Sequence, residues 1–415
     1  MTLLDRSYYR VDGESSHSRL KRLREEVCCS AEEQAERLGE HLEFCRARVP
    51  MYCDIELRHK SPLEALAGVP VFDKRRFSAA TTDAICSVAD APSRVDNTSG
   101  TSGQTFRFVV GRRERAIRRE HELLANEMLG LQPGERYLQI WGGHEGGSLA
   151  HRAMVAAYGR LTGRTLRIVR GSDRASLAGC FDDVRRHAGG VLVTYPSILY
   201  GLCLQDELVE PLGAYRSIIL TGEAVNYDLF AAFGLRDSLR NRYGSREFGA
   251  IALADEGAMH YFASRFFLEN DPDRGLLVTD LAKKAMPMLR YPIGDFVAAG
   301  FTRANRCEAL QRLAVLGRID GRTFDTLQGR SGTRYVGTFW TLMLRKTVGV
   351  EKFQLVQHAG HRLTVNYVGG LAPQEVQDRL RSAMGDDFRF QAVRRDDIPE
   401  LRNAKQRIVR REDAA

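Results

Sequence analysis

Residues 97–105 read Asn97-Thr98-Ser99-Gly100-Thr101-Ser102-Gly103-Gln104-Thr105, in which five of nine residues carry a hydroxyl group and two are glycines. Glycines let the backbone approach an anion closely, and hydroxyl and amide groups donate hydrogen bonds to phosphate oxygens. The Gly-Lys-Ser/Thr ending of a Walker loop is missing, so a different kind of phosphate loop is predicted. A flexible Ser/Gly linker has a similar composition, and this stretch alone does not separate the two.

Downstream of this loop, apolar runs of strand length alternate with helical stretches. A long amphipathic helix is expected over 112–129. The expected strands are 136–141, 166–169, 191–194 and 217–220. This alternation predicts an α/β fold with helices packed on a largely parallel sheet. Ligands bind at the carboxyl ends of such strands, so the candidate pocket loops are 141–144, 194–197 and 221–224.

The two ends of the chain have a different character from this central part. The first hundred residues are mostly helical in pattern, and a capping box at Ser30–Glu33 opens a helix toward Arg48. From His260 the pattern becomes antiparallel, with strands expected at 261–268, 275–280 and 288–291. We therefore expect a large N-terminal domain over 1–319, with mixed sheets and packed helices. A small, mobile α+β lid domain is expected over 320–415.

Composition narrows the class of protein. The 415 residues carry a net charge of +8, and 43% of them are hydrophobic, as in an ordinary globular protein. Basic residues are scattered, without the basic-aromatic stripe of a nucleic-acid-binding surface. The eight cysteines show no repeated CxxC spacing, residues 1–30 lack the apolar core of a signal peptide, and no apolar run reaches membrane-spanning length. A cytoplasmic enzyme without a membrane or nucleic-acid partner is expected.

Four further motifs carry candidate chemistry, although each has an ordinary structural reading. Tyr243–Gly249 places Glu247 among small residues, where it could hold Mg²⁺ or simply start a turn. Tyr291–Asp295 places Asp295 in a tight turn, where it could bind ribose hydroxyls or close a hairpin. Gly317–Asp320 reads as a polar linker, and Lys405 as either a solvated charge or a cation for developing negative charge.

Taken in their order along the chain, these motifs resemble those of the adenylate-forming superfamily of acyl-CoA synthetases, non-ribosomal peptide adenylation domains and luciferases. Within it, the sequence looks most like the phenylacetate-CoA ligase and capsular-biosynthesis ligase branch. The resemblance covers nearly the whole chain and includes two stretches near its start, Arg48–Tyr52 and Val69–Lys74.

The resemblance implies a role for each matching residue. The residues implied to hold the β- and γ-phosphates of ATP are Thr98, Ser99, Gly100, Thr101, Ser102 and Gly103. Those implied to line the adenine pocket are Gly222, Glu223 and Ala224. Tyr243 and Gly244 would lie between adenine and acyl group, and Glu247 would be the catalytic magnesium ligand. The remaining roles are Asp295 on the ribose with Arg318 close to it, Asp320 as the hinge of the lid, and Lys405 as the mobile catalytic lysine.

Several positions depart from the family pattern. Gln104-Thr105-Phe106 follows the phosphate loop where a Pro-Lys pair is usual, Arg246 replaces a Ser or Thr, and Ala404 replaces a Gly before the lysine. Part of the branch carries a zinc site, but only His260 and Cys307 lie near the matching places here. Two ligands do not close a tetrahedral site, so no zinc is expected.

The acyl pocket is expected at loops that contain Trp141, Gly142, His144 and Tyr195. An aromatic wall opposite glycines suits a flat aryl acid, although Trp141 fits core packing equally well and a lone histidine such as His144 is more often structural. The implied activity is ATP-dependent formation of an acyl-adenylate with release of pyrophosphate, followed by transfer to a thiol such as coenzyme A. Transfer to an amine, a hydroxyl or a carrier protein is a second possibility, and a non-catalytic binding protein is a third.

Overall fold

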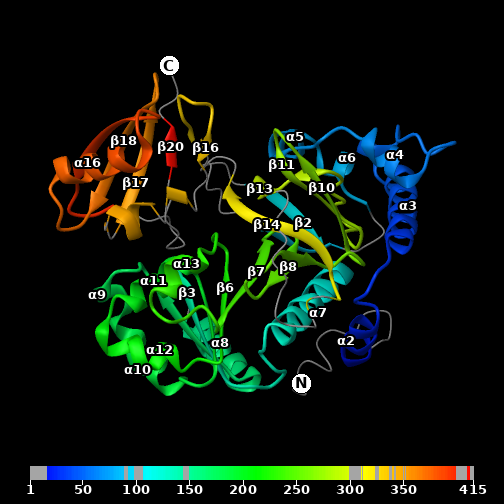
Figure 1. The fold of residues 1–415 in the computed structure, drawn as a ribbon. Coiled ribbons are helices and arrows are strands. Elements are labelled where there is room, and N and C mark those ends of the chain that lie inside the picture. The colour runs from blue at the N-terminus through cyan, green and yellow to red at the C-terminus, as the bar shows by residue number, and fades with distance from the viewer. Residues whose placement is uncertain are drawn as a thin grey trace.

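The computed structural model describes residues 16–87, 92–97, 106–143, 149–298, 310, 312–322, 327–335, 339–340, 343–348, 350, 352–398 and 409–411. A nine-stranded sheet in the order β13-β14-β9-β8-β7-β6-β5-β3-β4 dominates them (Figure 1). Its strands are β3 (Tyr137–Gly142), β4 (Arg164–Val169), β5 (Val191–Thr194), β6 (Ser217–Thr221), β7 (Leu239–Ser245), β8 (Gly249–Ala254), β9 (Met259–Tyr261), β13 (Asp295–Ala298) and β14 (Ala314–Arg322). From β4 to β7 the neighbours are parallel, and from β7 to β13 they are antiparallel.

Helices pack against both faces of this sheet. The helices of the N-terminal part are α2 (Ser16–Glu25), α3 (Ala31–Arg48), α4 (Pro62–Ala67), α5 (Lys74–Ala79), α6 (Thr82–Ile85) and α7 (Arg112–Met128). Those between the parallel strands and after β6 are α8 (Leu149–Thr162), α9 (Arg174–Leu177), α10 (Phe181–Arg186), α11 (Pro196–Cys203), α12 (Val209–Gly213) and α13 (Tyr227–Ala231). Successive residues of β5 enter opposite cores, Val191 and Val193 one and Leu192 the other. This strand is therefore apolar throughout, as in sheets covered on both faces.

Smaller sheets flank the large one. Two antiparallel strands, β1 (Pro92–Asn97) and β2 (Arg107–Gly111), form a hairpin. A three-stranded sheet contains β10 (Phe266–Asp271), β11 (Gly275–Asp280) and β12 (Tyr291–Pro292). The C-terminal part has its own core and a four-stranded sheet that lies apart from the large one (Figure 1). Its elements are β17 (Lys352–His358), β18 (Arg362–Val368), α16 (Pro373–Met384), β19 (Arg389–Arg394) and β20 (Val409–Arg411), preceded by the short pair β15 (Leu327–Gln328) and β16 (Arg334–Tyr335) and a π-helical turn (Met343–Val348).

The α/β class and most expected elements are confirmed, including the helix that Ser30 caps. The strand expected at 261–268 is wrong, because a turn at Phe262–Arg265 separates β9 from β10, which belong to different sheets. The strand expected at 288–291 is also wrong except at Tyr291, since Arg290 has a left-handed φ of 48°. Because β14 continues to Arg322, Asp320 lies inside a strand; the domain boundary and the hinge stay predictions.

No helix among the described residues is both long and apolar enough to cross a membrane.

Candidate active site

The loops that follow the parallel strands meet at one edge of the sheet. The Thr194 hydroxyl, at the end of β5, donates a hydrogen bond to the carbonyl of Ile140 in β3 at 3.0 Å. One residue further along each strand, the rings of Trp141 and Tyr195 lie 4.5 Å apart between centroids. Gly142, the last residue of β3, is buried. Three of the predicted acyl-pocket residues are therefore brought together, whereas His144 lies outside the described residues.

Glu223, which follows β6, is held by the start of α11. Its two carboxylate oxygens accept hydrogen bonds from the backbone N–H of Ser197 at 2.8 Å and from the Ser197 hydroxyl at 2.9 Å. The N-cap residue of α11, Tyr195, makes no side-chain cap of its own, so Glu223 fills that role from the neighbouring loop. Gly222 reaches the required turn with a φ of 76°, and Ala224 is exposed. Burial, and then the charge of Glu223, raise the pKa of the Tyr195 hydroxyl.

The turn between β7 and β8 carries Glu247. A Cβ at Gly244 would lie 2.1 Å from the carbonyl oxygen of Gly249, so the two strands approach more closely than a larger residue at that position would allow. Glu247 is only 5% exposed. Its Oε1 accepts a hydrogen bond from the Tyr291 hydroxyl at 3.3 Å and lies 3.6 Å from Lys74 Nζ. The carboxylate is thus buried beside one cation and one phenol.

The predicted phosphate loop, Thr98–Gly103, lies outside the described residues, but both of its ends are placed. Strand β1 ends at Asn97, which pairs with Arg107 at the start of β2. Asp96 lies 3.9 Å from the guanidinium of Arg246, next to Glu247. On the other side, the Phe106 ring stacks on Tyr291, the residue that donates to Glu247, with 6.1 Å between centroids. The loop therefore begins and ends beside the Glu247 turn.

Tyr243 and Asp295 are in direct contact. The Tyr243 hydroxyl donates a hydrogen bond to Asp295 Oδ2 at 2.7 Å, and the carboxylate is 5% exposed. Gly294 turns the chain into β13 with a φ of 84°. Arg318 is exposed on the adjacent strand β14, where it pairs with Ala298 rather than with Asp295, whose partner is Arg322. The hydrogen bond between Tyr243 and Asp295 is a contact that the motifs did not reveal, and Arg318 pairs further along β14.

The donor set suits a magnesium ion shared with phosphates. Mg²⁺ is commonly bound by one or two carboxylates and completed by water and substrate phosphate oxygens. Glu247 supplies one such carboxylate, and the Ser245 hydroxyl nearby is buried without a hydrogen-bond partner among the described residues. No group of three His, Cys, Asp or Glu in the described part of the chain could hold a metal alone. His260 hydrogen-bonds the Leu313 carbonyl at 3.0 Å, and Cys307 and Lys405 lie outside the described residues.

Lys74 was given no role by sequence reasoning. It is the first residue of α5, which Asp73 caps by accepting a hydrogen bond from the Arg76 N–H at 2.9 Å. This cap fixes the helix start, so that the half-exposed ammonium of Lys74 extends toward Glu247. The only indication in the sequence was that Lys74 ends the stretch Val69–Lys74, which is part of the family resemblance. A cation is thereby present beside the Glu247 carboxylate.

The sequence and the structure were compared with those of known proteins. No family of known proteins and no curated protein matches the sequence. Among solved structures, 2-hydroxyisobutyryl-CoA ligase in its postadenylation state matches over 94% of this chain and 92% of its own, with 16% identity and a TM-score of 0.68. The chain has the same fold as this ligase.

Two other solved structures match this fold over less of the chain. One of the fatty acyl-adenylate ligases from E. coli and L. pneumophila matches over 76% of this chain and 68% of its own, with 12% identity and a TM-score of 0.52. An amide bond synthetase from Marinactinospora thermotolerans matches over 75% and 67%, with 15% identity and a TM-score of 0.50. The solved structures that share this fold thus include a CoA ligase, a fatty acyl-adenylate ligase and an amide bond synthetase.

Proposed function

We propose that this protein activates a carboxylic acid with ATP, forming an acyl-adenylate and pyrophosphate. The observation that carries the proposal is the convergence at the β7–β8 turn. Buried Glu247, the Tyr243–Asp295 pair and both ends of the hydroxyl-rich loop meet there. A carboxylate for magnesium, an acid for a ribose and donors for phosphates are the groups needed to bind ATP.

In the proposed reaction an oxygen of the substrate carboxylate attacks the α-phosphorus of ATP. The bond between that phosphorus and the bridging oxygen breaks, and pyrophosphate leaves with the electron pair. Asp295 orients the ribose, while the loop 98–105 and Lys74 bind the departing phosphates. Bound at Glu247, Mg²⁺ would neutralise phosphate charge. Lys405 would approach the α-phosphate and stabilise the charge that develops there.

The substrate is proposed to be a small aryl acid. The rings of Trp141 and Tyr195 lie in contact, tilted by 46° to each other, and offer an aromatic surface. Offset and tilted ring contacts with a third aromatic group would add binding free energy beyond burial alone. We assign the chain to the phenylacetate-CoA ligase and capsular-biosynthesis ligase branch, with coenzyme A as the acceptor and rotation of the lid about Asp320 between the two steps.

ATP–pyrophosphate exchange tests the first step. The full chain with Mg²⁺ is given a panel of aryl and aliphatic acids, without coenzyme A, and incorporation of labelled pyrophosphate into ATP is followed. Exchange that depends on an aryl acid is the expected result. A folded protein that exchanges with no acid in the panel would favour a non-catalytic binding protein, and exchange with aliphatic acids alone would overturn the aryl assignment.

The acceptor is tested separately by AMP release. Continuous AMP release that requires coenzyme A, with a thioester as product, is expected. The amide bond synthetase has the same fold, so a panel of amines is the necessary comparison. Turnover with an amine and not with coenzyme A would replace the thioester step by amide formation while leaving the adenylation step intact.

A further inference from the structure

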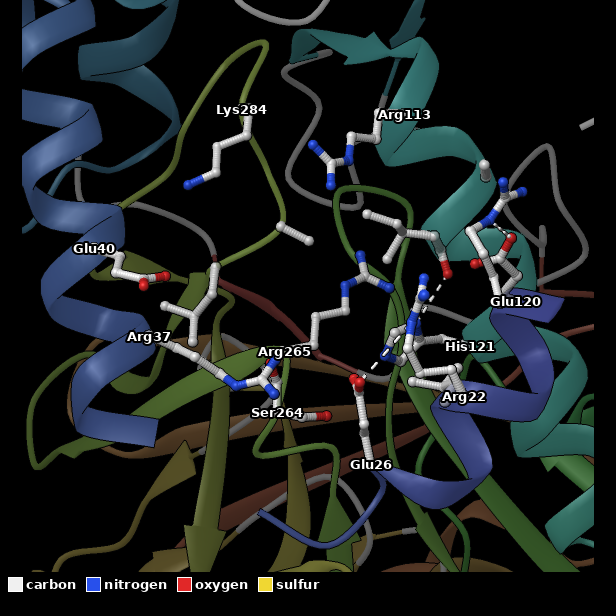
Figure 2. Close-up of a pocket in the computed structure, with 16 residues that line it drawn as sticks. Arg22, Glu26, Arg37, Glu40, Arg113, Glu120, His121, Ser264, Arg265 and Lys284 are labelled. Atoms are coloured by element: carbon white, nitrogen blue, oxygen red, sulfur yellow. Dashed lines mark hydrogen bonds and ion pairs between the residues drawn. The ribbon is translucent and has the colours of Figure 1, made fainter. Parts of the chain in front are cut away.

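A pocket of about 410 Å³ lies between the N-terminal helices and α7 (Figure 2). None of its lining residues belongs to the candidate active site. Helices α2, α3 and α7 and the chain around residues 264–265 and 281–284 contribute to it. Its cationic side chains are Arg19, Arg22, Arg37, Arg113, Arg265 and Lys284. Its carboxylates are Glu26, Glu40 and Glu120. Cations therefore outnumber carboxylates in the lining by two to one.

Most of the negative charge is already matched within the protein. Glu120 pairs with Arg19 at 2.6 Å, and Glu26 lies 3.9 Å from Arg22. Arg37 and Lys284 form no ion pair with the described residues, and Lys284 instead contacts the His41 ring at 2.9 Å. Burial lowers the pKa of Lys284; the charges of Glu40 and Asp280 act against this lowering, and the charge of Arg113 adds to it. The pocket thus holds an excess of positive charge that an anion would relieve.

Arg265 brings an unsatisfied donor to this pocket. The residue is 2% exposed, and its Nε and Nη2 donate to Asp280, while Nη2 also donates to the Phe248 carbonyl. Its Nη1 is buried and has no hydrogen-bond partner among the described residues. Figure 2 shows the guanidinium pointing into the pocket, below Arg113 and above Arg37. A buried donor left unpaired is costly, so an acceptor in the pocket would be stabilising.

His121 brings an unsatisfied acceptor. Its Nδ1 lies 2.9 Å from the Ile117 carbonyl, which can only accept, so Nδ1 carries the proton. Burial and the charge of Arg265 lower the pKa of His121 to about 3, and the ring is therefore neutral. Its Nε2 is then a lone-pair acceptor, and it is buried with no hydrogen-bond partner in the part of the chain that the structure describes. A hydroxyl group is the kind of ligand atom that would satisfy it.

We propose that this pocket binds a small organic phosphate that also carries a hydroxyl group. Arginines from α2, α3, α7 and the β9–β10 turn line the pocket. Several guanidinium groups suit a phosphate monoester better than a single carboxylate, because the phosphate offers more oxygen atoms as acceptors. Arg265 Nη1 donates to a phosphate oxygen. The ligand hydroxyl donates to His121 Nε2. The site is separate from ATP binding and does not depend on the proposed function.

Binding of glycerol 3-phosphate to the full chain tests the proposal. Isothermal titration is carried out at constant ionic strength without ATP, and inorganic phosphate, glycerol and citrate serve as comparison ligands. Saturable binding of one glycerol 3-phosphate is expected, tighter than that of the three others. The double variant Arg37→Ala and Lys284→Ala should weaken it about tenfold or more, since two charge-assisted contacts are lost. Neither residue holds the fold through an ion pair with the described residues.

Two controls make the result decisive. The double variant Arg185→Ala and Arg379→Ala removes two exposed charges outside the pocket, and Glu247→Gln alters the candidate active site; both should bind glycerol 3-phosphate as the parent does. An absence of saturable binding, or equal weakening in the two double variants, would overturn the site. Tighter binding of citrate would overturn the phosphate assignment, and equal binding of inorganic phosphate would remove the role of the hydroxyl.

Discussion

Glu223 and Glu247 follow neighbouring strands at the same edge of the large sheet, but they are held in opposite ways. Glu223 has both oxygens engaged at 2.8 and 2.9 Å by Ser197, at the start of α11. Glu247 makes only longer contacts, 3.3 Å from the Tyr291 hydroxyl and 3.6 Å from Lys74 Nζ, although it is 5% exposed. One carboxylate is satisfied by the fold, and the other retains capacity for a ligand.

The difference indicates two roles for acidic residues at this edge of the sheet, one in holding a loop and one in binding a ligand. Two short hydrogen bonds to a helix N-terminus stabilise the loop that carries Glu223, which makes it a positioning residue for the backbone around Gly222. The long contacts of the buried Glu247 carboxylate offset little of the free-energy cost of burying its charge, and a bound cation would offset more of it. The four predictions that follow test this contrast, from the largest expected effect to the smallest.

Replacing Glu247 with Gln should nearly abolish adenylation with little change in stability. The amide keeps the shape and the contact with Tyr291 but lacks the charge that binds Mg²⁺. We expect a loss of about 100-fold or more in ATP–pyrophosphate exchange, the size typical of removing one stabiliser of transition-state charge. Exchange rates across a magnesium titration and a thermal melt measure the two effects. Activity above a tenth of the parent value would remove Glu247 from the metal site.

Replacing Gly244 with Ala should destabilise the turn that carries Glu247. The added Cβ would lie 2.1 Å from the Gly249 carbonyl oxygen, so the hairpin must shift. A cost of about 1–3 kcal/mol is typical of such overpacking. Gly213→Ala is the matched control, because its Cβ meets nothing within 4 Å. Urea unfolding of both variants measures the difference, and equal midpoints would contradict the close approach of the two strands.

The sequence predicted some of these features and missed others. Strand β5 has the predicted bounds, and helix α3 begins after Ser30 and ends at Arg48 as predicted, since an apolar run of strand length and a capping box are local signals. The turn at Phe262–Arg265 was missed because Arg265 is held by Asp280, 15 residues away, and local pattern does not reveal such a partner. Contacts between distant segments were missed for the same reason. Motif order indicated Glu247 and Asp295, but it did not show that Lys74 approaches Glu247 or that Glu223 caps α11.

Replacing Glu223 with Ala should lower the stability of the protein but have little effect on the rate of adenylation. The backbone N–H and the hydroxyl of Ser197 would lose their acceptor, and α11 would lose its cap. Loss of a helix cap costs about 0.5–2 kcal/mol. Urea unfolding should show this loss, while exchange at a temperature where both proteins are folded should fall far less than in Glu247→Gln. A Glu223 variant as inactive as the Glu247 variant would show that both carboxylates act in catalysis.

Replacing Tyr243 with Phe should have the smallest effect, and it distinguishes binding from stability. The substitution removes the hydroxyl that donates to Asp295 at 2.7 Å, which leaves a carboxylate of 5% exposure with one hydrogen bond fewer. If Asp295 holds the ribose, the apparent KM for ATP should rise about fivefold, equivalent to a contribution of about 1 kcal/mol from one hydrogen bond, while the KM for the acid stays constant.

Tyr367→Phe is the matched control, because its hydroxyl also donates one hydrogen bond, to the Leu371 carbonyl at 2.6 Å, in the C-terminal sheet. Both variants should lose similar stability, but only Tyr243→Phe should change the KM for ATP. A similar loss of stability in both with an unchanged KM would mean that the Tyr243–Asp295 pair supports the sheet edge without holding the nucleotide, and Asp295 would then resemble Glu223 rather than Glu247.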